Sequence, residues 1–230
     1  MKHKIILSLF CLHVATFGFS QDINSVLQLV KTKLELVKDY QAMGTMKTNV
    51  TFLKVPLSKI SLYYKKPDKI RIKTERGVSF VPKGAMNISM SDVFNQGAYM
   101  VLDAGSDILN GSKVRVAKLL PVDDNSDLVL STLYIDVLNN VILKCKTTTR
   151  ENGSYELMMT YNKYLAYGLP DKISFTFNTK DYKLPKGITF DFDDGQPTGN
   201  VNKQKNKKGS AEISISSYQI NKGLKDDVFR

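Results

Sequence analysis

Apolar and polar residues alternate along most of this 230-residue chain, and this alternation constrains the fold more than any other feature. A period of two is typical of a β-strand with one buried face. Short connections such as Asn139-Asn140 and Asn152-Gly153 indicate hairpins, so neighbouring strands should be antiparallel. The pattern predicts strands at residues 46–54, 57–66, 69–75, 113–121, 128–137, 141–150, 155–164, 171–178 and 211–221.

An amphipathic helix is predicted ahead of the strands. Asp22 is a suitable N-cap, and the helix should run to about Tyr40 and stop before Gly44. A sheet this wide with one apolar face must curl to bury that face, so the fold class is α+β with a strongly curved antiparallel sheet. The apolar residues at helical spacing are Ile23, Val26, Leu27, Val30, Leu34 and Val37.

Residues 78–103 do not show the alternation of the predicted strands, because methionines and aromatic residues surround short helical patterns there. Methionine gives an adaptable apolar surface. The segment is interpreted in two ways, as ordinary covering of the core or as a lid over a cavity.

The first twenty residues are typical of a secretory signal peptide. A basic start precedes the apolar run 5–19, and Gly18 and Ser20 supply the small residues of a cleavage site. The run is shorter than the roughly twenty residues that span a bilayer. We therefore expect residues 1–20 to be removed, and residues 21–230 to form a single domain in the periplasm.

Cleavage removes both histidines, His3 and His13, together with Cys11. The remainder has no histidine and one cysteine, Cys145. This excludes Ser-His-Asp and Cys-His catalysis and histidine-containing zinc sites. We expect no enzyme, no metal and no cofactor. Cys145 lies in a strand pattern and is interpreted as a buried structural thiol, with a reactive thiol as the alternative.

One carboxylate pair remains as a candidate for chemistry. Asp191 and Asp193 alternate with phenylalanines, so in a strand both carboxylates would share a face. An EF-hand loop starting at Asp191 fails, because Gln196 and Asn202 occupy two of its key positions. The pair is interpreted as a solvated strand face, and a carboxylate-based hydrolase is the third functional hypothesis.

The leader contains Lys2 and Lys4, so cleavage lowers the net charge from +11 to about +9. Export argues against a nucleic-acid partner. Residues from about 194 to 210 are poor in apolar side chains and are expected to form a flexible basic loop. The alternative is an arm that attracts an anionic membrane surface. Its lysines are Lys203, Lys205, Lys207 and Lys208.

Three segments carry a resemblance to a known family. They are ISLYYKKPDKIRIK at 60–73, the hairpin sequence at 131–164, and YGLPDKISFTF at 167–177. With the leading helix, they make the chain resemble the periplasmic lipoprotein-carrier (LolA-like) superfamily, which includes the outer-membrane lipoprotein chaperone and its docking receptor. The resemblance covers essentially the whole of residues 21–230.

The resemblance implies an incomplete β-barrel, closed by the N-terminal helix and a short helical lid insertion, with an apolar cavity for acyl chains. Lys66 matches the position of an arginine that helps to hold the lid shut in the family. Lysine lacks the planar fork of arginine, which puts an identical latch in doubt. Tyr63 matches the family's usual aromatic residue, and Ile70 matches its large apolar residue after the turn.

Alternation places a set of apolar side chains on the concave face of the curled sheet. They would line an apolar pocket of the kind that ligands use, or else pack against the helices as core. The residues on this face are Phe52, Ile60, Leu62, Tyr64, Ile70 and Ile72, with Met90, Phe94 and Met100 across the mouth.

The leading functional hypothesis is a non-enzymatic, exported protein that binds lipid or acyl chains, acting as a carrier or chaperone in outer-membrane lipoprotein sorting. Its expected partners are an acylated lipoprotein or other lipid and a membrane receptor, and the protein is expected to be a monomer. The alternative is an envelope sensor or interaction module on the same fold, without cargo.

Overall fold

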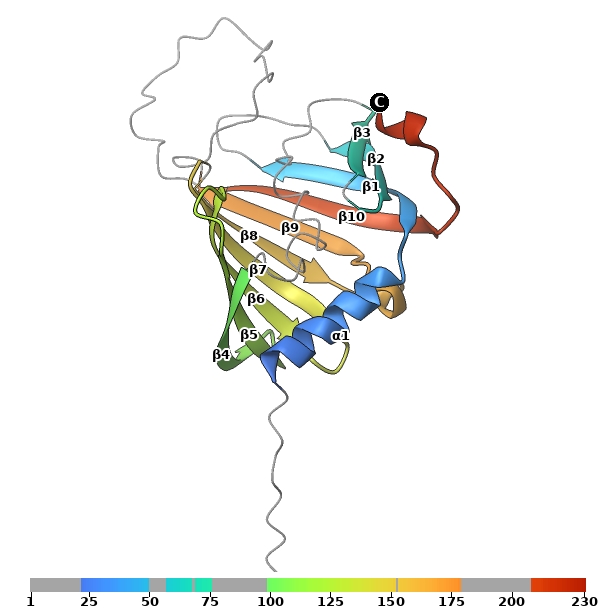
Figure 1. Ribbon diagram of the computed structural model, residues 1–230. Helices are drawn as coiled ribbons and strands as arrows, with labels where there is room; N and C mark the ends of the chain where they lie inside the picture. Colours follow the sequence, from blue (N-terminus) through green and yellow to red (C-terminus); the bar gives the residue numbers. More distant parts are fainter. Residues whose placement is uncertain (1–21, 50–56, 68, 76–98, 152, 179–207) are drawn as a thin grey trace, which may run out of the picture.

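The computed structural model describes residues 22–49, 57–67, 69–75, 99–151, 153–178 and 208–230. They form one large curved antiparallel sheet, with a helix across its concave side (Figure 1). The elements are α1 (Ile23–Glu35), β1 (Asp39–Asn49), β2 (Ser58–Lys65), β3 (Lys69–Thr74), β4 (Tyr99–Leu109), β5 (Ser112–Pro121), β6 (Leu128–Asp136), β7 (Val141–Thr149), β8 (Gly153–Thr160), η1 (Leu165–Tyr167), β9 (Lys172–Asn178), β10 (Lys208–Ile220) and η3 (Asp226–Phe229).

The ten strands are ordered β3-β2-β1-β10-β9-β8-β7-β6-β5-β4, and every neighbouring pair is antiparallel. β3 and β4 are the two edges, so the sheet is an open half-barrel rather than a closed barrel. This confirms the predicted large antiparallel sheet. The predicted helical lid falls largely on residues 76–98, which lie outside the described part of the chain.

β4 corrects the sequence analysis, which assigned residues 78–103 to a partly helical segment. Tyr99 to Leu109 instead pair with β5, and the register shifts between Asp103 and Ser106. All six residues from Asp103 to Ile108 are exposed, so this part of the strand lacks the alternation on which the prediction relied. β10 begins at Lys208, within the segment that was expected to form a flexible basic loop, and residues 194–207 of that segment lie outside the described part of the chain.

α1 begins as predicted but ends earlier. The Asp22 carboxylate accepts hydrogen bonds from the backbone N–H groups of Asn24 (3.1 Å) and Ser25 (3.2 Å), which caps the helix. The helix ends at Glu35 rather than near Tyr40, because Tyr40 is already paired with Tyr64 of β2. The sheet therefore takes the residues that helical spacing had assigned to α1.

The core lies between α1 and the concave face of the sheet. The helix buries one face there, with Val26 and Val30 almost inaccessible to water. Along β9, the rings of Phe175 and Phe177 stack with their centroids 5.2 Å apart. Gly209 makes room for Phe177, because a Cβ at this glycine would lie 2.4 Å from the end of the ring.

Cys145 is buried in this core, as its strand setting predicted. Its sulfur lies 3.3 Å from the hydroxyl oxygens of both Ser131 and Thr147. Burial raises the pKa of the thiol despite these two hydrogen bonds. A neutral, enclosed thiol is the form expected of a structural cysteine.

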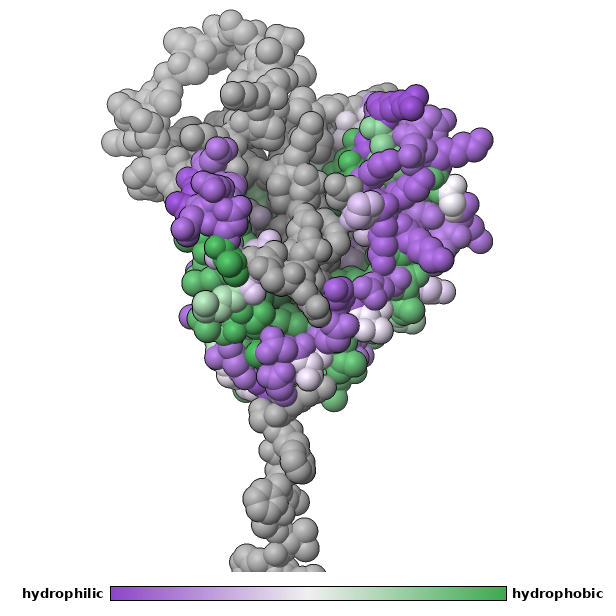
Figure 2. Space-filling model, in the orientation of Figure 1, coloured by the Kyte–Doolittle hydropathy of each residue, from purple (hydrophilic) through white to green (hydrophobic). Residues whose placement is uncertain are grey.

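The C-terminal segment folds back over the outside of the β2–β3 hairpin, a hydrophilic part of the surface in Figure 2. Asp226 accepts hydrogen bonds of 2.7 Å from both Lys65 and Lys69. These bonds lower the pKa of its carboxyl group from 3.8 to about 2. The segment is also held at its start, where the buried Asp39 carboxylate accepts the backbone N–H of Gly223 at 3.1 Å.

Two findings limit what the described residues do. None of their helices is long and apolar enough to cross a membrane. None of their histidine, cysteine, aspartate and glutamate side chains forms a group of three that could hold a metal ion.

Candidate functional site: an apolar pocket beside helix α1

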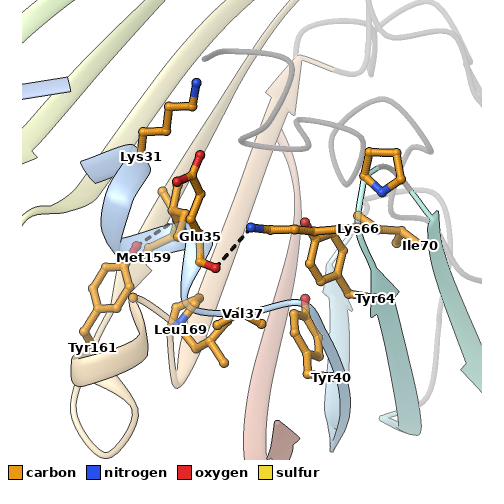
Figure 3. A pocket seen from close by; sticks show the side chains of 14 residues that line it. Lys31, Glu35, Val37, Tyr40, Tyr64, Lys66, Ile70, Met159, Tyr161 and Leu169 are labelled. Carbon is orange, nitrogen blue, oxygen red and sulfur yellow. Dashed lines mark hydrogen bonds between the residues drawn. The ribbon is translucent and has the colours of Figure 1, made fainter. Parts of the chain in front are cut away.

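A pocket of about 430 Å³ lies between the C-terminal half of α1 and the ends of several strands (Figure 3). Its volume falls within the roughly 300–1,000 Å³ that small-molecule sites occupy. Most of its walls are apolar. The lining residues are Lys31, Leu34, Glu35, Val37, Tyr40, Tyr64, Lys66, Pro67, Ile70, Met159, Tyr161, Gly168, Leu169 and Pro170.

One wall is a row of side chains that runs across three strands. Tyr40 pairs with Tyr64, and Tyr64 pairs with Ile70, so strand register places all three on the same face. The two tyrosine rings lie with their centroids 5.2 Å apart. This wall therefore offers a continuous apolar and aromatic surface.

The other wall comes from the end of β8 and the turn before β9. The Tyr161 hydroxyl donates to the backbone oxygen of Ile142 at 2.9 Å, which fixes the ring. Gly168 has φ of +64°, a left-handed conformation that favours glycine, and this turn brings Leu169 beneath the helix. Leu169 is buried, so it forms part of the pocket floor.

A cluster of tyrosines supports the pocket from behind. The Tyr218 ring packs edge-on against Tyr40 at 5.2 Å and against Tyr164 at 4.8 Å. Its hydroxyl donates to the backbone oxygen of Pro170 at 2.7 Å. Burial raises the pKa values of Tyr40, Tyr161 and Tyr218 above the ordinary value of 10, so these phenols are neutral at physiological pH.

Charged residues form the rim. Lys31 and Glu35 come from α1, and Lys66 comes from the turn between β2 and β3. The Lys66 ammonium group donates to the backbone oxygen of Glu35 at 3.2 Å, as the dashed line in Figure 3 shows. The last carbonyl groups of a helix have no partner within the helix, so this lysine both satisfies one and ties the hairpin to α1.

The predicted cavity residues divide into two groups. Tyr64 and Ile70 line the pocket, and Lys66 stands at its rim. Ile60 and Leu62 are instead fully buried core residues, only 2% and 1% exposed. Ile72 packs against the same core. Strand alternation places Ile60, Leu62 and Tyr64 on the same face, so it does not distinguish the buried core positions from the pocket position.

Met100 does not line this pocket. Tyr99 and Val101 pack against the core, so alternation along β4 turns Met100 to the other face, where it is 60% exposed. For the other predicted residues, the structure describes either nothing or, for Lys208, only the backbone. They are Phe52, Met90, Phe94, Asp191, Asp193, Lys203, Lys205, Lys207 and Lys208.

Several pocket residues were missed from the sequence. Leu34 and Val37 were recognised as apolar helical positions but were assigned to the core. Tyr40 was assigned to the helix, although it faces the pocket from β1. Met159 and Tyr161 gave no signal beyond strand alternation, since their partners across the pocket are far away in sequence.

Similar architectures are found among solved structures. A lipoprotein-sorting protein domain from Vibrio parahaemolyticus superposes with a TM-score of 0.55 at 13% identity, over 91% of this chain and 97% of that chain. A DUF1329 family protein from Desulfovibrio piger gives 0.54 at 11% identity, over 90% and 97%. A LolA superfamily protein from Nitrosomonas europaea gives 0.52 at 11% identity, over 90% and 96%.

No family model matches the sequence, and no curated protein matches it. At identities of 11–13% the structural likeness speaks for the fold rather than for a function. The curved antiparallel sheet of the architecture anticipated from the 60–73, 131–164 and 167–177 segments is observed as an open half-barrel, and the anticipated lid falls largely outside the described residues. The chain has the half-barrel fold of the lipoprotein-sorting and LolA-superfamily structures.

Proposed function

We propose that the protein binds acyl chains in the pocket beside α1 and carries a lipid or an acylated lipoprotein through the periplasm. The observation that carries this proposal is the apolar pocket itself. At about 30 Å³ for each water-sized group, 430 Å³ accommodates about fourteen such groups, or the length of one acyl chain. Each methylene taken from water contributes about 0.8 kcal/mol to binding.

The same pocket argues against a reaction. Its carboxylate and its two ammonium groups lie at the rim, and burial keeps the phenols of Tyr40 and Tyr161 neutral by raising their pKa values. Among the described residues, no pair of carboxylates faces this pocket to share acid and base roles. A binding protein without catalysis fits this arrangement.

Lys66 is proposed to act as a latch. Its hydrogen bond to the end of α1 crosses the pocket between the two elements that would have to separate for a bulky cargo to enter. Because the bond joins an ammonium group to a backbone carbonyl, it is a single-point contact that thermal motion can break and re-form.

Export and delivery complete the proposal. Residues 1–20 would direct the chain to the periplasm, and the basic segment with Lys203, Lys205, Lys207 and Lys208 would approach an anionic membrane. A membrane receptor would then receive the cargo. A second candidate is an envelope sensor that carries no cargo, and burial of Ile60 and Leu62 in the core, where a cavity wall was expected, favours it.

The direct test is a binding experiment with delipidated protein. A lipopeptide with one acyl chain should be retained, whereas the same peptide without the acyl chain should not. Native mass spectrometry of protein purified from its own cell envelope should in addition show a co-purifying lipid. Protein that retains neither lipopeptide nor lipid would refute acyl-chain binding and would leave the sensor as the better hypothesis.

A further inference from the structure

The charges of the pocket are separated from its apolar surface. Figure 3 shows the Lys31, Glu35 and Lys66 side chains towards one end of the pocket, with Tyr161 and Leu169 at the other. Among the described lining residues, two ammonium groups and one carboxylate give the rim a net positive charge. One lysine stands on α1 and the other on the β2–β3 turn, so the two cations come from different walls of the pocket.

The rim also offers hydrogen-bond donors. An ammonium group has three N–H donors, and the bond from Lys66 to the Glu35 backbone uses one of them. The Tyr40 hydroxyl makes no hydrogen bond with the described residues, although its ring is held between Tyr64 and Tyr218. In Figure 3 the Tyr40 and Tyr64 hydroxyl ends are turned towards Lys66.

A purely hydrocarbon ligand would leave the remaining Lys66 N–H groups and the Tyr40 hydroxyl facing an apolar surface, at a cost in lost hydration. A ligand with an anionic end would satisfy them, because hydrogen bonds to charged oxygen atoms are the stronger ones. The apolar floor of the pocket therefore favours a hydrocarbon chain at one end of the ligand, and the donors at the rim favour an anionic group at the other end.

We propose that the pocket selects an amphiphile with one acyl chain and a carboxylate or phosphate head group. The chain lies on the apolar floor, and the head group accepts hydrogen bonds from Lys31, Lys66 and the Tyr40 hydroxyl. This inference rests on the proposed acyl-chain binding and adds the charge of the cargo.

The test compares ligands that share one chain and differ in the head group. Calorimetry with delipidated full-length protein would measure dodecanoate, dodecyl phosphate, dodecanol and dodecyltrimethylammonium, with inorganic phosphate as the ligand without a chain. We expect the two anionic amphiphiles to bind about fivefold or more tightly than dodecanol for each lysine engaged, which is about 1 kcal/mol for a partly exposed ion pair. Inorganic phosphate should not bind measurably, and added salt should reduce the preference.

Variants assign the preference to the rim. Lys66→Met and Lys31→Met should each lower the ratio of the affinity for dodecanoate to the affinity for dodecanol. Lys66→Arg should retain the preference, which distinguishes lost charge from a disturbed helix. Lys113→Met is the matched control, since Lys113 is an exposed lysine of β5 outside the pocket, and it should bind like the unaltered protein.

Three results would overturn the inference. They are equal affinities for dodecanoate and dodecanol, tighter binding of the cationic amphiphile, or an effect of Lys113→Met as large as that of Lys66→Met. In each case acyl-chain binding itself would stand. Absence of binding by every amphiphile would instead refute the proposed function.

Discussion

The volume of the pocket predicts how affinity should depend on acyl-chain length. A pocket of 430 Å³ holds about fourteen groups of about 30 Å³ each. Each added methylene should strengthen binding by up to about 0.8 kcal/mol, or about fourfold, until the pocket is full. The pocket is open at its rim, so methylene groups near the opening stay partly in contact with water. For these groups we expect at least about half of the 0.8 kcal/mol, which is a roughly twofold gain in affinity per methylene.

The assay is displacement of a fluorescent fatty acid by saturated carboxylates of increasing length. Affinity should rise steadily and then level off near about fourteen carbons. Ile70→Trp adds about 60 Å³ to the pocket wall, so at about 30 Å³ per group it should move the plateau to a chain shorter by roughly two carbons. Ile108→Trp adds the same bulk on β4, where Ile108 is 72% exposed, and should leave the plateau in place.

Two outcomes would refute this reasoning. Affinity that keeps rising well beyond the predicted plateau would show that the chain is bound elsewhere or along an open groove. A plateau that is the same in the unaltered protein and in Ile70→Trp would show that the pocket wall does not limit chain length.

Three further predictions concern stability and reactivity. Gly209→Ala should lower the free energy of unfolding in urea by about 1–3 kcal/mol, because the new Cβ collides with the Phe177 ring, and adding Phe177→Leu should recover part of this loss. The Asp226 carboxyl has a pKa lowered from 3.8 to about 2, so its ion pairs stabilise the docked C-terminal segment above pH 3.8 and are lost as the pH falls towards 2. Hydrogen exchange of residues 225–230 should therefore accelerate between these two pH values. In Asp226→Asn the exchange should already be fast at neutral pH. Cys145 should react with a thiol reagent only as fast as the protein opens, since burial raises its pKa, and rapid labelling of the folded protein would contradict this.

Strand alternation was enough to predict most of the sheet, because each of the nine predicted strands has one face in a continuous core. The start of α1 was also predictable from the Asp22 cap and the spacing of Val26 and Val30. These are local signals. They depend on residues within one or two turns, or on one strand, and not on the rest of the fold.

The errors arose where distant segments decide the outcome. Tyr40 fits the helical spacing, but pairing with Tyr64 draws it into β1. β4 was missed because its exposed second half does not alternate. Ile60 and Tyr64 are equivalent in the sequence pattern, yet the first is buried in the core and the second lines the pocket. Tertiary packing decides this, and alternation contains no information about it.

The place of β10 in the sheet has a consequence for the order of folding. β1 and β10 are neighbours in the middle of the sheet, although they come from opposite ends of the chain. Before β10 is synthesised, the strands on its two sides cannot join into one sheet, and such distant pairings form slowly. The complete sheet therefore forms only when nearly the whole chain has been made. If the leader predicted at residues 1–20 directs export, this late joining keeps the sheet incomplete until the last strand is available.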